Sequence, residues 1–331
     1  MSKDFKVKIL ATGMAVPEKI LTNFDLEKIV DTTDEWIRKR TGMVQRHIAD
    51  ENTAASDLAY EAAKNALQYA NMEPKELDMI VISTVTSDYS FPSTACLLQE
   101  KLGCRDIPAF DVSAGCTGFI YGITIAKQFI ETGYYNNILV IGVEILTKIT
   151  NWKDRGTCVL FGDGAGAAIL TRATKSDSSF IIDTYLGANG KVAELLIRKG
   201  GGSRNPISKK VIEQDMPFLE MEGNKIFRLA VKAMGDSAEI ILKKNNLTGN
   251  DLDWLIPHQA NLRIIYATAH RIKLPKEKVI INIQKYGNTS SASIPIALDE
   301  AIREGKIKRG DLVMLDAFGA GLTWGSVLFR Y

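Results

Sequence analysis

The 331-residue chain has few of the residues that hold metal ions, with only 4 cysteines and 3 histidines. The cysteines form no Cys-x-x-Cys pair and the histidines form no His-x-x-x-His pair, which are spacings of common zinc sites. We therefore expect no metal site, and free thiols of the kind kept in a reducing compartment. The residues concerned are Cys96, Cys104, Cys116, Cys158, His47, His258 and His270.

The chain also lacks an excess of charge of one sign. Its 41 basic and 39 acidic residues give a net charge of +2, which does not predict binding to nucleic acid. No apolar run approaches the ~18 residues of a membrane-spanning helix, and the first five residues carry no signal-peptide pattern. We expect a cytoplasmic protein that binds neither nucleic acid nor a membrane.

Apolar runs without polar alternation recur along the chain, separated by helical patterns. Such runs are typical of strands covered on both faces, and the alternation predicts an α/β fold. Helices are expected over 54–70 and 93–102, and strands over 79–84, 110–112, 137–143, 278–282 and 311–316. In the first helix, one buried face is indicated by the spacing of Ala55, Leu58, Ala59, Ala62, Ala66 and Ala70.

Three landmarks recur at nearly the same separation along the chain and indicate a duplicated half. The sequence Glu-Leu-Asp at 76–78 returns as Asp-Leu-Asp at 251–253, and Leu-Val at 139–140 returns at 312–313. The turn with Cys116 returns as the turn with Asn288. We predict halves at 1–172 and 173–331, joined through the polar stretch 171–179. The Gly-rich loop at 200–203 is a flexible insertion, a lid or an ordinary surface loop.

Residues 110–119, FDVSAGCTGF, have the pattern of a strand, a tight turn and a helix. Cys116 would then lie at a helix N-terminus, where the dipole and free N–H groups favour the thiolate, so a lowered pKa is expected. The small neighbours leave room for an incoming carbonyl group. These residues alone support a reactive nucleophile and a buried structural cysteine equally. Cys96 is expected in the core, and Cys104 and Cys158 are expected to be structural.

Two further segments place polar side chains after strands. His258 in LIPHQANLR follows an apolar run, at the strand end where sites form in α/β sheets. Asn288 lies in the turn KYGNTSSAS, and FGAGLTWG at 318–325 is a glycine-rich loop whose N–H groups could face an oxyanion. Each also has an ordinary structural interpretation, because Gly, Asn, Thr and Ser are common turn residues.

Segments along nearly the whole chain resemble the thiolase-fold condensing enzymes, specifically the β-ketoacyl-acyl-carrier-protein synthase III family. The match is weak only over about 172–215. The resemblance implies two duplicated α/β halves that form a layered α-β-α-β-α core. It is carried by TNFDLEKIVDTTDEWIRKRTGM (22–43), SFPSTAC (90–96), AFDVSAGCTGF, DRGTCVLFGDGAGAA (154–168), MEGNKIFRLAV (221–231), LDWLIPHQANLRI, YGNTSSAS and FGAGLTWGS.

The resemblance implies a catalytic role for three residues. Cys116 would accept the acyl group, while His258 and Asn288 would assist decarboxylation and stabilise the resulting enolate. The oxyanion hole would use the N–H groups of Cys116 and Ala320. Many relatives have glycine at the position of Ala320, so this chain departs from the family there by one methyl group.

The resemblance also implies binding residues. Phe91 would reach into the acyl pocket of a partner subunit in a homodimer. Coenzyme A would be bound by Trp36, Arg40, Arg155, Gly156, Asn224, Phe227, Ala260 and Asn261. An acidic acyl carrier protein would dock on Arg228, Gln259, Ala260, Asn261, Leu262, Arg263 and Arg271.

The implied activity is the initiating condensation of type II fatty acid biosynthesis. An acyl group, acetyl by family default, passes from acyl-CoA to Cys116 and is then condensed with malonyl-acyl-carrier protein. No cofactor is expected, since acyl-CoA and malonyl-acyl-carrier protein are substrates. The main alternative is a condensing enzyme of secondary metabolism with another acyl primer.

Other classes fit the residues less well. A dinucleotide-dependent oxidoreductase is suggested by Gly162-Asp163-Gly164-Ala165-Gly166, but the following 167–170 is a strand pattern rather than a helix. A degradative thiolase would need a second cysteine in 316–325, which has none. A hydroxymethylglutaryl-CoA synthase would need a glutamate at the nucleophile, which Glu76 and Glu144 do not obviously supply. A non-catalytic carrier-binding module would not need Cys116, His258 and Asn288 together.

Overall fold

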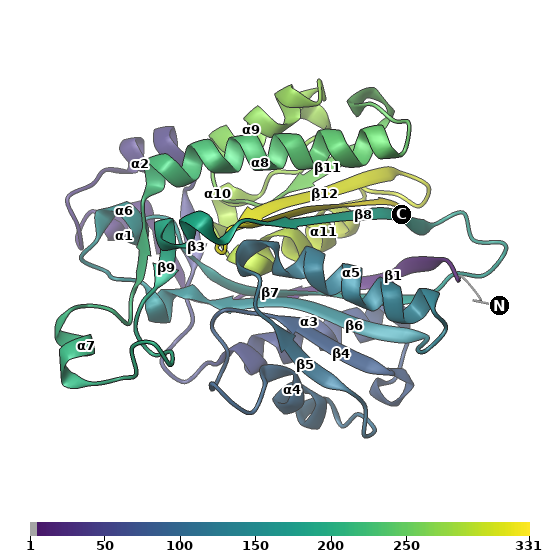
Figure 1. Cartoon of the computed structure of the whole chain (residues 1–331), viewed down its shortest axis with the longest axis horizontal. Coiled ribbons are helices and arrows are strands. Elements are labelled where there is room, and N and C mark those ends of the chain that lie inside the picture. Colours follow the sequence, from purple (N-terminus) through teal and green to yellow (C-terminus); the bar gives the residue numbers. More distant parts are fainter. Residues whose placement is uncertain (1–4) are drawn as a thin grey trace.

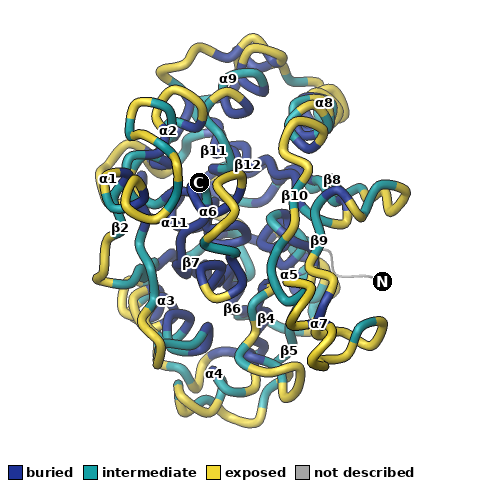
Figure 2. The backbone as a smooth tube through the Cα atoms, turned by 90° about the vertical axis from the view of Figure 1, so that its left-hand side faces the viewer, coloured by how far each residue is buried: buried dark blue, intermediate teal, exposed yellow. Residues whose placement is uncertain are grey.

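The computed structural model describes residues 5–331 and consists of five layers. Two mainly buried sheets lie one above the other, helices separate them, and further helices cover their outer faces (Figure 1). The tube in Figure 2 shows the sheets as the buried interior, with exposed residues gathered on the outer helices and loops. The predicted α-β-α-β-α core is confirmed.

The first sheet has five strands in the order β1-β7-β6-β4-β5. β4 pairs in parallel with β5 and β6, whereas β7 is antiparallel to both β6 and β1. The predicted strands at 79–84, 110–112 and 137–143 are all present. The bounds are β1 (Val7–Ala15), β4 (Met79–Ser83), β5 (Ala109–Val112), β6 (Asn137–Ile145) and β7 (Asp163–Arg172).

The second sheet repeats this order with one strand fewer. Its strands are β11 (Trp254–Pro257), β12 (Leu312–Gly319), β13 (Thr323–Arg330) and β8 (Phe180–Ala188), in that order. β11 and β12 are parallel, and the remaining pairs are antiparallel. The predicted strand over 278–282 is wrong, because that run makes only a single bridge, from Val279 to Leu255, and caps the sheet edge.

Two helices form the middle layer and aim their N-termini at the same region. α5 (Gly118–Glu131) and α11 (Ser293–Arg303) each follow a short 3-10 turn, at Gly115–Thr117 and Ser290–Ala292. The outer face of the first sheet is covered by α3 (Ala55–Ala70) and α4 (Thr94–Leu102), and that of the second by α8 (Gly223–Lys244) and α9 (Leu262–Arg271).

Alternation along each strand explains the layers. In β4, Val81 packs toward the middle helices with Phe119 and Ile294, whereas Ile80 and Ile82 pack outward against α3. Both faces of the strand are therefore apolar, as the continuous apolar runs predicted. Buried apolar area is the main stabilising term in such a core, at about 25 cal/mol per Å².

The two sheets share one register. Met79 pairs with Ile138 in the first sheet, and Trp254 pairs with Val313 in the second. The number of residues from Met79 to Trp254 equals the number from Ile138 to Val313. We call this common spacing the repeat separation. The predicted duplication of the fold is visible in this register. The predicted boundary between residues 172 and 173 lies where β7 ends, and it stays a prediction.

The 3-10 turns before α5 and α11 are related by the same repeat separation. This relation places Cys116 opposite Ser291, because each is the central residue of its turn. The sequence-based match of Cys116 with Asn288 is therefore wrong by three residues. Asn288 precedes its turn, whereas Cys116 lies within its own.

Short elements complete the chain. Between β9 and β10, a loop with α7 extends from the body of the molecule (Figure 1) and includes the Gly-rich residues 200–203. No helix within residues 5–331 is long and apolar enough to span a membrane. The remaining bounds are β2 (Ile20–Thr22), α1 (Asn23–Leu26), α2 (Asp34–Thr41), β3 (Gln45–His47), α6 (Arg155–Cys158), β9 (Leu196–Arg198), α7 (Lys209–Glu213), β10 (Leu219–Met221) and α10 (Ile283–Tyr286).

Candidate active site

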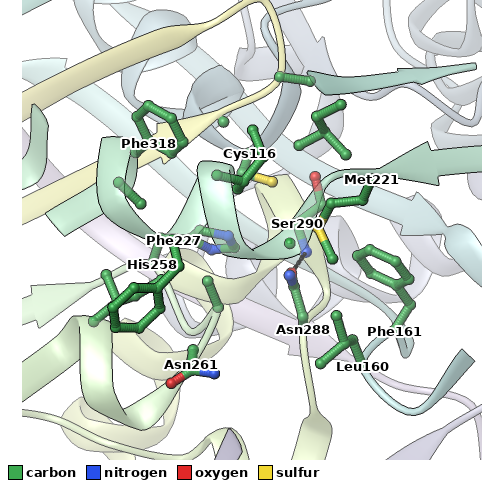
Figure 3. A pocket seen from close by; sticks show the side chains of 18 of the residues that line it. Cys116, Leu160, Phe161, Met221, Phe227, His258, Asn261, Asn288, Ser290 and Phe318 are labelled. Carbon is green, nitrogen blue, oxygen red and sulfur yellow. Dashed lines mark hydrogen bonds between the residues drawn. The ribbon is translucent and has the colours of Figure 1, made fainter. Parts of the chain in front are cut away.

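A cavity of about 480 Å³ lies where the two middle helices begin, and it is lined by Cys116, His258 and Asn288. Figure 3 shows the three side chains around one space, although they come from three separate segments of the chain. Cys116 lies before α5, His258 after β11, and Asn288 just before the 3-10 turn that leads into α11. The structure thus brings together the three residues singled out in the sequence.

The small residues around Cys116 make room for protein as well as for a ligand. Gly115 has φ +54°, and a Cβ atom there would lie 2.8 Å from the backbone N of Ala320. A Cβ atom on Gly118 would lie 1.6 Å from Ser83 Oγ, and one on Gly319 would lie 2.4 Å from the backbone N of Cys116. A side chain at Gly115 or Gly319 would separate the Cys116 turn from the loop with Ala320, and one at Gly118 would separate α5 from β4, so glycine is needed for these close approaches.

The expected low pKa of Cys116 is contradicted. Burial raises the pKa of its thiol to about 11, and the negative charge of Glu144 acts in the same direction. The hydroxyl of Ser290 and the backbone N–H groups of Cys116 and Ala320 lower the pKa, but by less than burial raises it. Cys116 is half-buried beside the cavity, and the lost hydration of its thiolate outweighs the hydrogen bonds that these donors offer. The resting thiol is therefore protonated at neutral pH.

His258 is uncharged and held at both ends. It is 2% exposed, and burial lowers the pKa of its imidazole to about 3. Its backbone N–H donates to the carbonyl of Asp316 at 2.8 Å, and Nδ1 lies 2.7 Å from Ser293 Oγ. The fixed backbone N–H of Gln259 donates to the same Ser293 oxygen, so the proton of Ser293 is available for Nδ1. In that arrangement the imidazole proton lies on Nε2.

Asn288 is fixed by the turn that contains it. Its backbone N–H donates to the carbonyl of Leu160 at 2.9 Å, and its side-chain Oδ1 accepts the N–H of Ser290 at 2.9 Å. The dashed line in Figure 3 marks the second bond. With Oδ1 engaged, the Nδ2 amino group is the free donor of Asn288. Ser290 adopts a left-handed conformation with φ +49°.

Sequence reasoning missed three groups that act on this site. Ser290 and Ser293 lie within or beside the quoted motif YGNTSSAS, which was the available signal. Glu144 was considered only as the catalytic glutamate of another enzyme class, and it does not line the cavity but contacts residues that do. Its fully buried carboxylate accepts hydrogen bonds from Ser290 and Ser291 in the turn before α11. No local pattern marks Glu144, because its partners are far away along the chain.

Most of the predicted coenzyme A residues lie along the cavity. Trp36, Arg40, Gly156, Asn224, Phe227, Ala260 and Asn261 all line it. Arg155 does not line the cavity, but its guanidinium lies over the Trp36 ring, 5.0 Å from the centroid. An indole with a cation on its face forms a plane of the kind that stacks on a nucleobase.

The predicted carrier-binding residues differ in whether a partner protein could reach them and in whether their charge is already paired. Arg263 is exposed, lines the cavity and lies 4.8 Å from the centroid of Phe227. Arg228 is also exposed. Gln259 is 1% exposed and bonded to backbone groups, so its prediction as a carrier contact is wrong. Arg271 is exposed but paired with Asp236 and Glu239, which offset its charge.

Three other sequence-based interpretations can be compared with the structure. Cys96 is exposed rather than buried in the core, and its thiol donates to the carbonyl of Ala109 in the edge strand β5. Gly164 and Gly166 lie within β7, and a Cβ atom on Gly166 would meet α11 at 2.6 Å, so packing explains these glycines. The strand leaves no helix N-terminus for a dinucleotide pyrophosphate. Phe91 is 86% exposed and faces away from its own core.

Comparisons with known proteins agree with this site. Residues 110–190 match the family described as 3-oxoacyl-[acyl-carrier-protein] synthase III, and residues 242–331 match its C-terminal region. The chain is 55% identical over 331 residues to β-ketoacyl-[acyl-carrier-protein] synthase III of Caldanaerobacter subterraneus subsp. tengcongensis, covering 100% of this chain and 99% of the relative. It is 53% identical to the Natranaerobius thermophilus protein of the same name, covering 98% and 99%.

A solved structure gives the same result. The crystal structure of 3-oxoacyl-[acyl-carrier-protein] synthase III from Aquifex aeolicus superposes with a TM-score of 0.91 at 50% identity, covering 98% of this chain and 100% of that one. Full-length identity, fold and site geometry all agree. The chain therefore belongs to the β-ketoacyl-[acyl-carrier-protein] synthase III family of condensing enzymes.

Proposed function

We propose that this enzyme transfers an acyl group from acyl-CoA to Cys116 and then condenses it with malonyl-acyl-carrier protein. The products are 3-oxoacyl-acyl-carrier protein, coenzyme A and carbon dioxide, the initiating condensation of fatty acid biosynthesis. The observation that carries this proposal is the convergence of Cys116, His258 and Asn288 on one cavity. A nucleophile and two uncharged hydrogen-bond donors are the groups that the two steps require.

In the first step, the Cys116 sulfur attacks the thioester carbonyl and the coenzyme A thiolate leaves. Cys116 loses its proton and the coenzyme A thiolate gains one. The reaction is close to isoenergetic, because one thioester and one thiol are exchanged for another thioester and another thiol. The carbonyl oxygen becomes negative in the tetrahedral intermediate. The backbone N–H groups of Cys116 and Ala320 both lower the pKa of the thiol by hydrogen bonding. Two donors at this position support their assignment as the oxyanion hole. The methyl group of Ala320 leaves its N–H free to donate.

In the second step, the malonyl group loses carbon dioxide and leaves an enolate. His258 would donate from Nε2 and Asn288 from Nδ2 to the enolate oxygen. Both donors are uncharged at neutral pH, because the pKa of His258 is lowered to about 3, so they stabilise the enolate without protonating it. The enolate carbon then attacks the acyl group and the Cys116 thiolate leaves, completing the cycle.

Coenzyme A would enter along the cavity with its adenine against Trp36 and Arg155. The pantetheine arm would pass Gly156, Asn224, Ala260 and Asn261 toward Cys116. The carrier protein would dock around Arg263 and Arg228 at the mouth of the same channel, where the phosphopantetheine arm must enter. Complementary charge on an acidic partner chiefly raises the association rate.

We also propose that the enzyme is a cytoplasmic homodimer. β5 is the edge strand of the first sheet, and the exposed Phe91 lies on the segment before α4, which packs on β5. An exposed edge strand is a surface for pairing with a second copy. Phe91 would then close the acyl pocket of the partner subunit.

The acyl primer is tested by intact-mass spectrometry after incubation with a panel of acyl-CoAs. We expect one acyl group on the wild-type chain, acetyl among the accepted groups, and none on Cys116→Ala. A label that persists on the variant would contradict the assignment of Cys116. A preference for a primer other than short acyl groups would favour a role in secondary metabolism.

A further inference from the structure

Glu144 is a buried carboxyl group that the two proposed steps do not use. It is 0% exposed near the C-terminal end of β6, and within residues 5–331 its hydrogen-bond partners are uncharged. Burial raises its pKa to about 7. Its oxygens accept from Thr86 Oγ1 at 2.6 Å, the Val85 N–H at 3.2 Å, Ser291 Oγ at 3.1 Å and Ser290 Oγ at 3.3 Å. Burying a carboxylate without a neighbouring cation is costly, so a buried glutamate at this position suggests a function.

The duplicated architecture shows what is unusual about this position. The repeat separation places Glu144 of β6 opposite Gly319 of β12. Gly319 packs against the backbone of Cys116, in the turn before α5. Glu144 contacts the corresponding turn before α11, where Ser290 and Ser291 lie. One half thus uses a residue without a side chain at this contact, and the other uses a carboxylate.

We propose that Glu144 is a positioning residue that restrains the Cys116 thiol by holding the hydroxyl group of Ser290. Ser290 is the link because it lines the cavity with Cys116, donates its N–H to Asn288 and donates its hydroxyl to Glu144. This inference rests on the proposed function for its biological meaning, but the thiol chemistry can be measured without any substrate.

The hydroxyl of Ser290 has one proton and two candidate acceptors. It can donate to the Glu144 carboxylate or to a thiolate on Cys116, where it would lower the pKa of the thiol. The ionised carboxylate takes the proton and also repels a second negative charge, which raises the pKa of Cys116. The other groups around Glu144 are hydroxyls and one amide, and His258 in the same cavity is uncharged. Glu144 therefore adds to the effect of burial in disfavouring the Cys116 thiolate.

Glutamine at position 144 can replace the carboxylate with little change of shape. The Val85 N–H can only donate. The Thr86 hydroxyl also donates to position 144, because its oxygen already accepts the N–H of Ile145. The amide oxygen must face them, so the amide nitrogen faces Ser290 and Ser291. Ser291 can then donate to the carbonyl of Ser83, its second acceptor at 3.0 Å. Ser290 is left free to donate to the Cys116 thiolate.

The experiment measures alkylation of Cys116 by iodoacetamide against pH, followed by mass spectrometry of the Cys116 peptide. For Glu144→Gln we expect the midpoint to fall by about one pH unit, because a negative charge and a competing acceptor are removed. Alkylation at pH 8 should be several-fold faster, somewhat less than the tenfold gain in thiolate, because a less basic thiolate is less nucleophilic. An unchanged or raised midpoint would overturn the proposal.

The matched control is Asp163→Asn. Asp163 is also 0% exposed, at the start of β7 in the same sheet, but it bonds to Ala49 and Thr147. Its replacement removes a buried carboxylate without touching Ser290, so the alkylation midpoint should not move. An equal shift in this control would show a general effect of buried charge and contradict the specific role of Glu144.

Ser290→Ala tests the relay even if a Glu144 variant fails to fold. In the wild-type background, the Ser290 hydroxyl donates mainly to the carboxylate and lowers the pKa of Cys116 only slightly, so removing it should raise the midpoint by less than about 0.3 pH units. In the Glu144→Gln background, the same change should raise the midpoint clearly, so the two substitutions are not additive. A rise of one unit in the wild-type background would show that the proton already serves the thiolate and would overturn the proposal. Acylation by acyl-CoA, measured separately, distinguishes this failure from failure of the proposed function.

Discussion

The two halves of the molecule place different chemistry on equivalent positions. β4 ends in Ser83, which faces Gly118, the first residue of α5. β11 is followed by His258, which faces Ser293, the first residue of α11. The repeat separation of the sheet register relates Ser83 to His258 and Gly118 to Ser293. One strand end is tightly packed against its helix, whereas the other holds an imidazole by a serine hydroxyl.

The turns before the middle helices show the same division. Gly115 and Ser290 are equivalent and both have a positive φ, +54° and +49°. Each is followed by the central residue of a 3-10 turn, Cys116 in one half and Ser291 in the other. The backbone is shared, so the thiol of Cys116 is a side-chain difference within a common turn. In the proposed mechanism, the first half supplies this thiol as the nucleophile, and the second half supplies the donors that stabilise negative charge.

The sheet edges differ as well. The first sheet ends in β5, a paired strand of four residues, while the second ends in the single bridge at Val279. An edge strand has a row of unpaired backbone groups that can hydrogen-bond to a strand of a second copy, whereas a single bridge has no such row. This difference favours the first half as the place where two copies would meet.

The packing at Gly118 can be broken directly. Gly118→Ala would place a Cβ atom 1.6 Å from Ser83 Oγ, so the helix or the strand must shift. We expect the free energy of unfolding to fall by about 1–3 kcal/mol, the usual range for overpacking a core. Urea denaturation measures it, with Gly190→Ala as the control because a Cβ atom there meets nothing within 4 Å. Equal stability of the two variants would show that the halves do not differ in packing here.

The imidazole at the other strand end gives a pH dependence that Ser83 cannot give. The pKa of His258 is lowered from 6.5 to about 3, so the unfolded chain binds this proton more readily. The contribution of His258 to stability is complete above pH 6.5 and is lost as the pH falls toward 3, by up to about 1.4 kcal/mol per unit. The midpoint temperature of thermal unfolding should therefore fall less between pH 6.5 and 5 in His258→Gln than in the wild-type protein. The control His270→Gln alters an exposed histidine, and a wild-type slope in His258→Gln would refute the assignment.

The smallest expected effect concerns the surface beside His258. Arg263→Glu should raise KM for malonyl-acyl-carrier protein several-fold at low salt and less at high salt, because screening weakens exposed charges. Arg271→Gln is the matched control on the same helix, since its charge is already paired with Asp236 and Glu239. Acylation by acyl-CoA should change little in either variant. A parallel loss of acylation in Arg263→Glu would place that residue in the coenzyme A site instead.

The sequence was sufficient for most of the fold and for the three central residues. Strands covered on both faces and the duplicated landmarks depend on local composition, so β4, β5, β6 and β12 could be predicted. The match of Cys116 with Asn288 was wrong because motif positions do not show where a turn begins, whereas strand pairing fixes the register. The run 278–282 is apolar because it caps β11, which a single-sequence pattern cannot distinguish from a full strand.

The electrostatics of the site could not be predicted. A helix N-terminus can be recognised in the sequence, but the burial that raises the pKa of Cys116 is produced by loops from both halves. The position of Glu144 depends on the same tertiary contacts, as does the burial of Gln259 next to the exposed Arg263. Charge and exposure are properties of the packed structure, whereas motif spacing is a property of the chain.

The division of labour between the halves is tested most directly by separating the two half-reactions in single-turnover experiments. In His258→Ala and in Asn288→Ala, acylation of Cys116 by acetyl-CoA should stay within about threefold of wild type, because the oxyanion donors of Cys116 and Ala320 are intact. Condensation with malonyl-acyl-carrier protein should fall by about 10²–10⁴, the cost of losing a transition-state donor. Cys116→Ala sets the background for both steps. Acylation that falls as far as condensation in either variant would contradict the account.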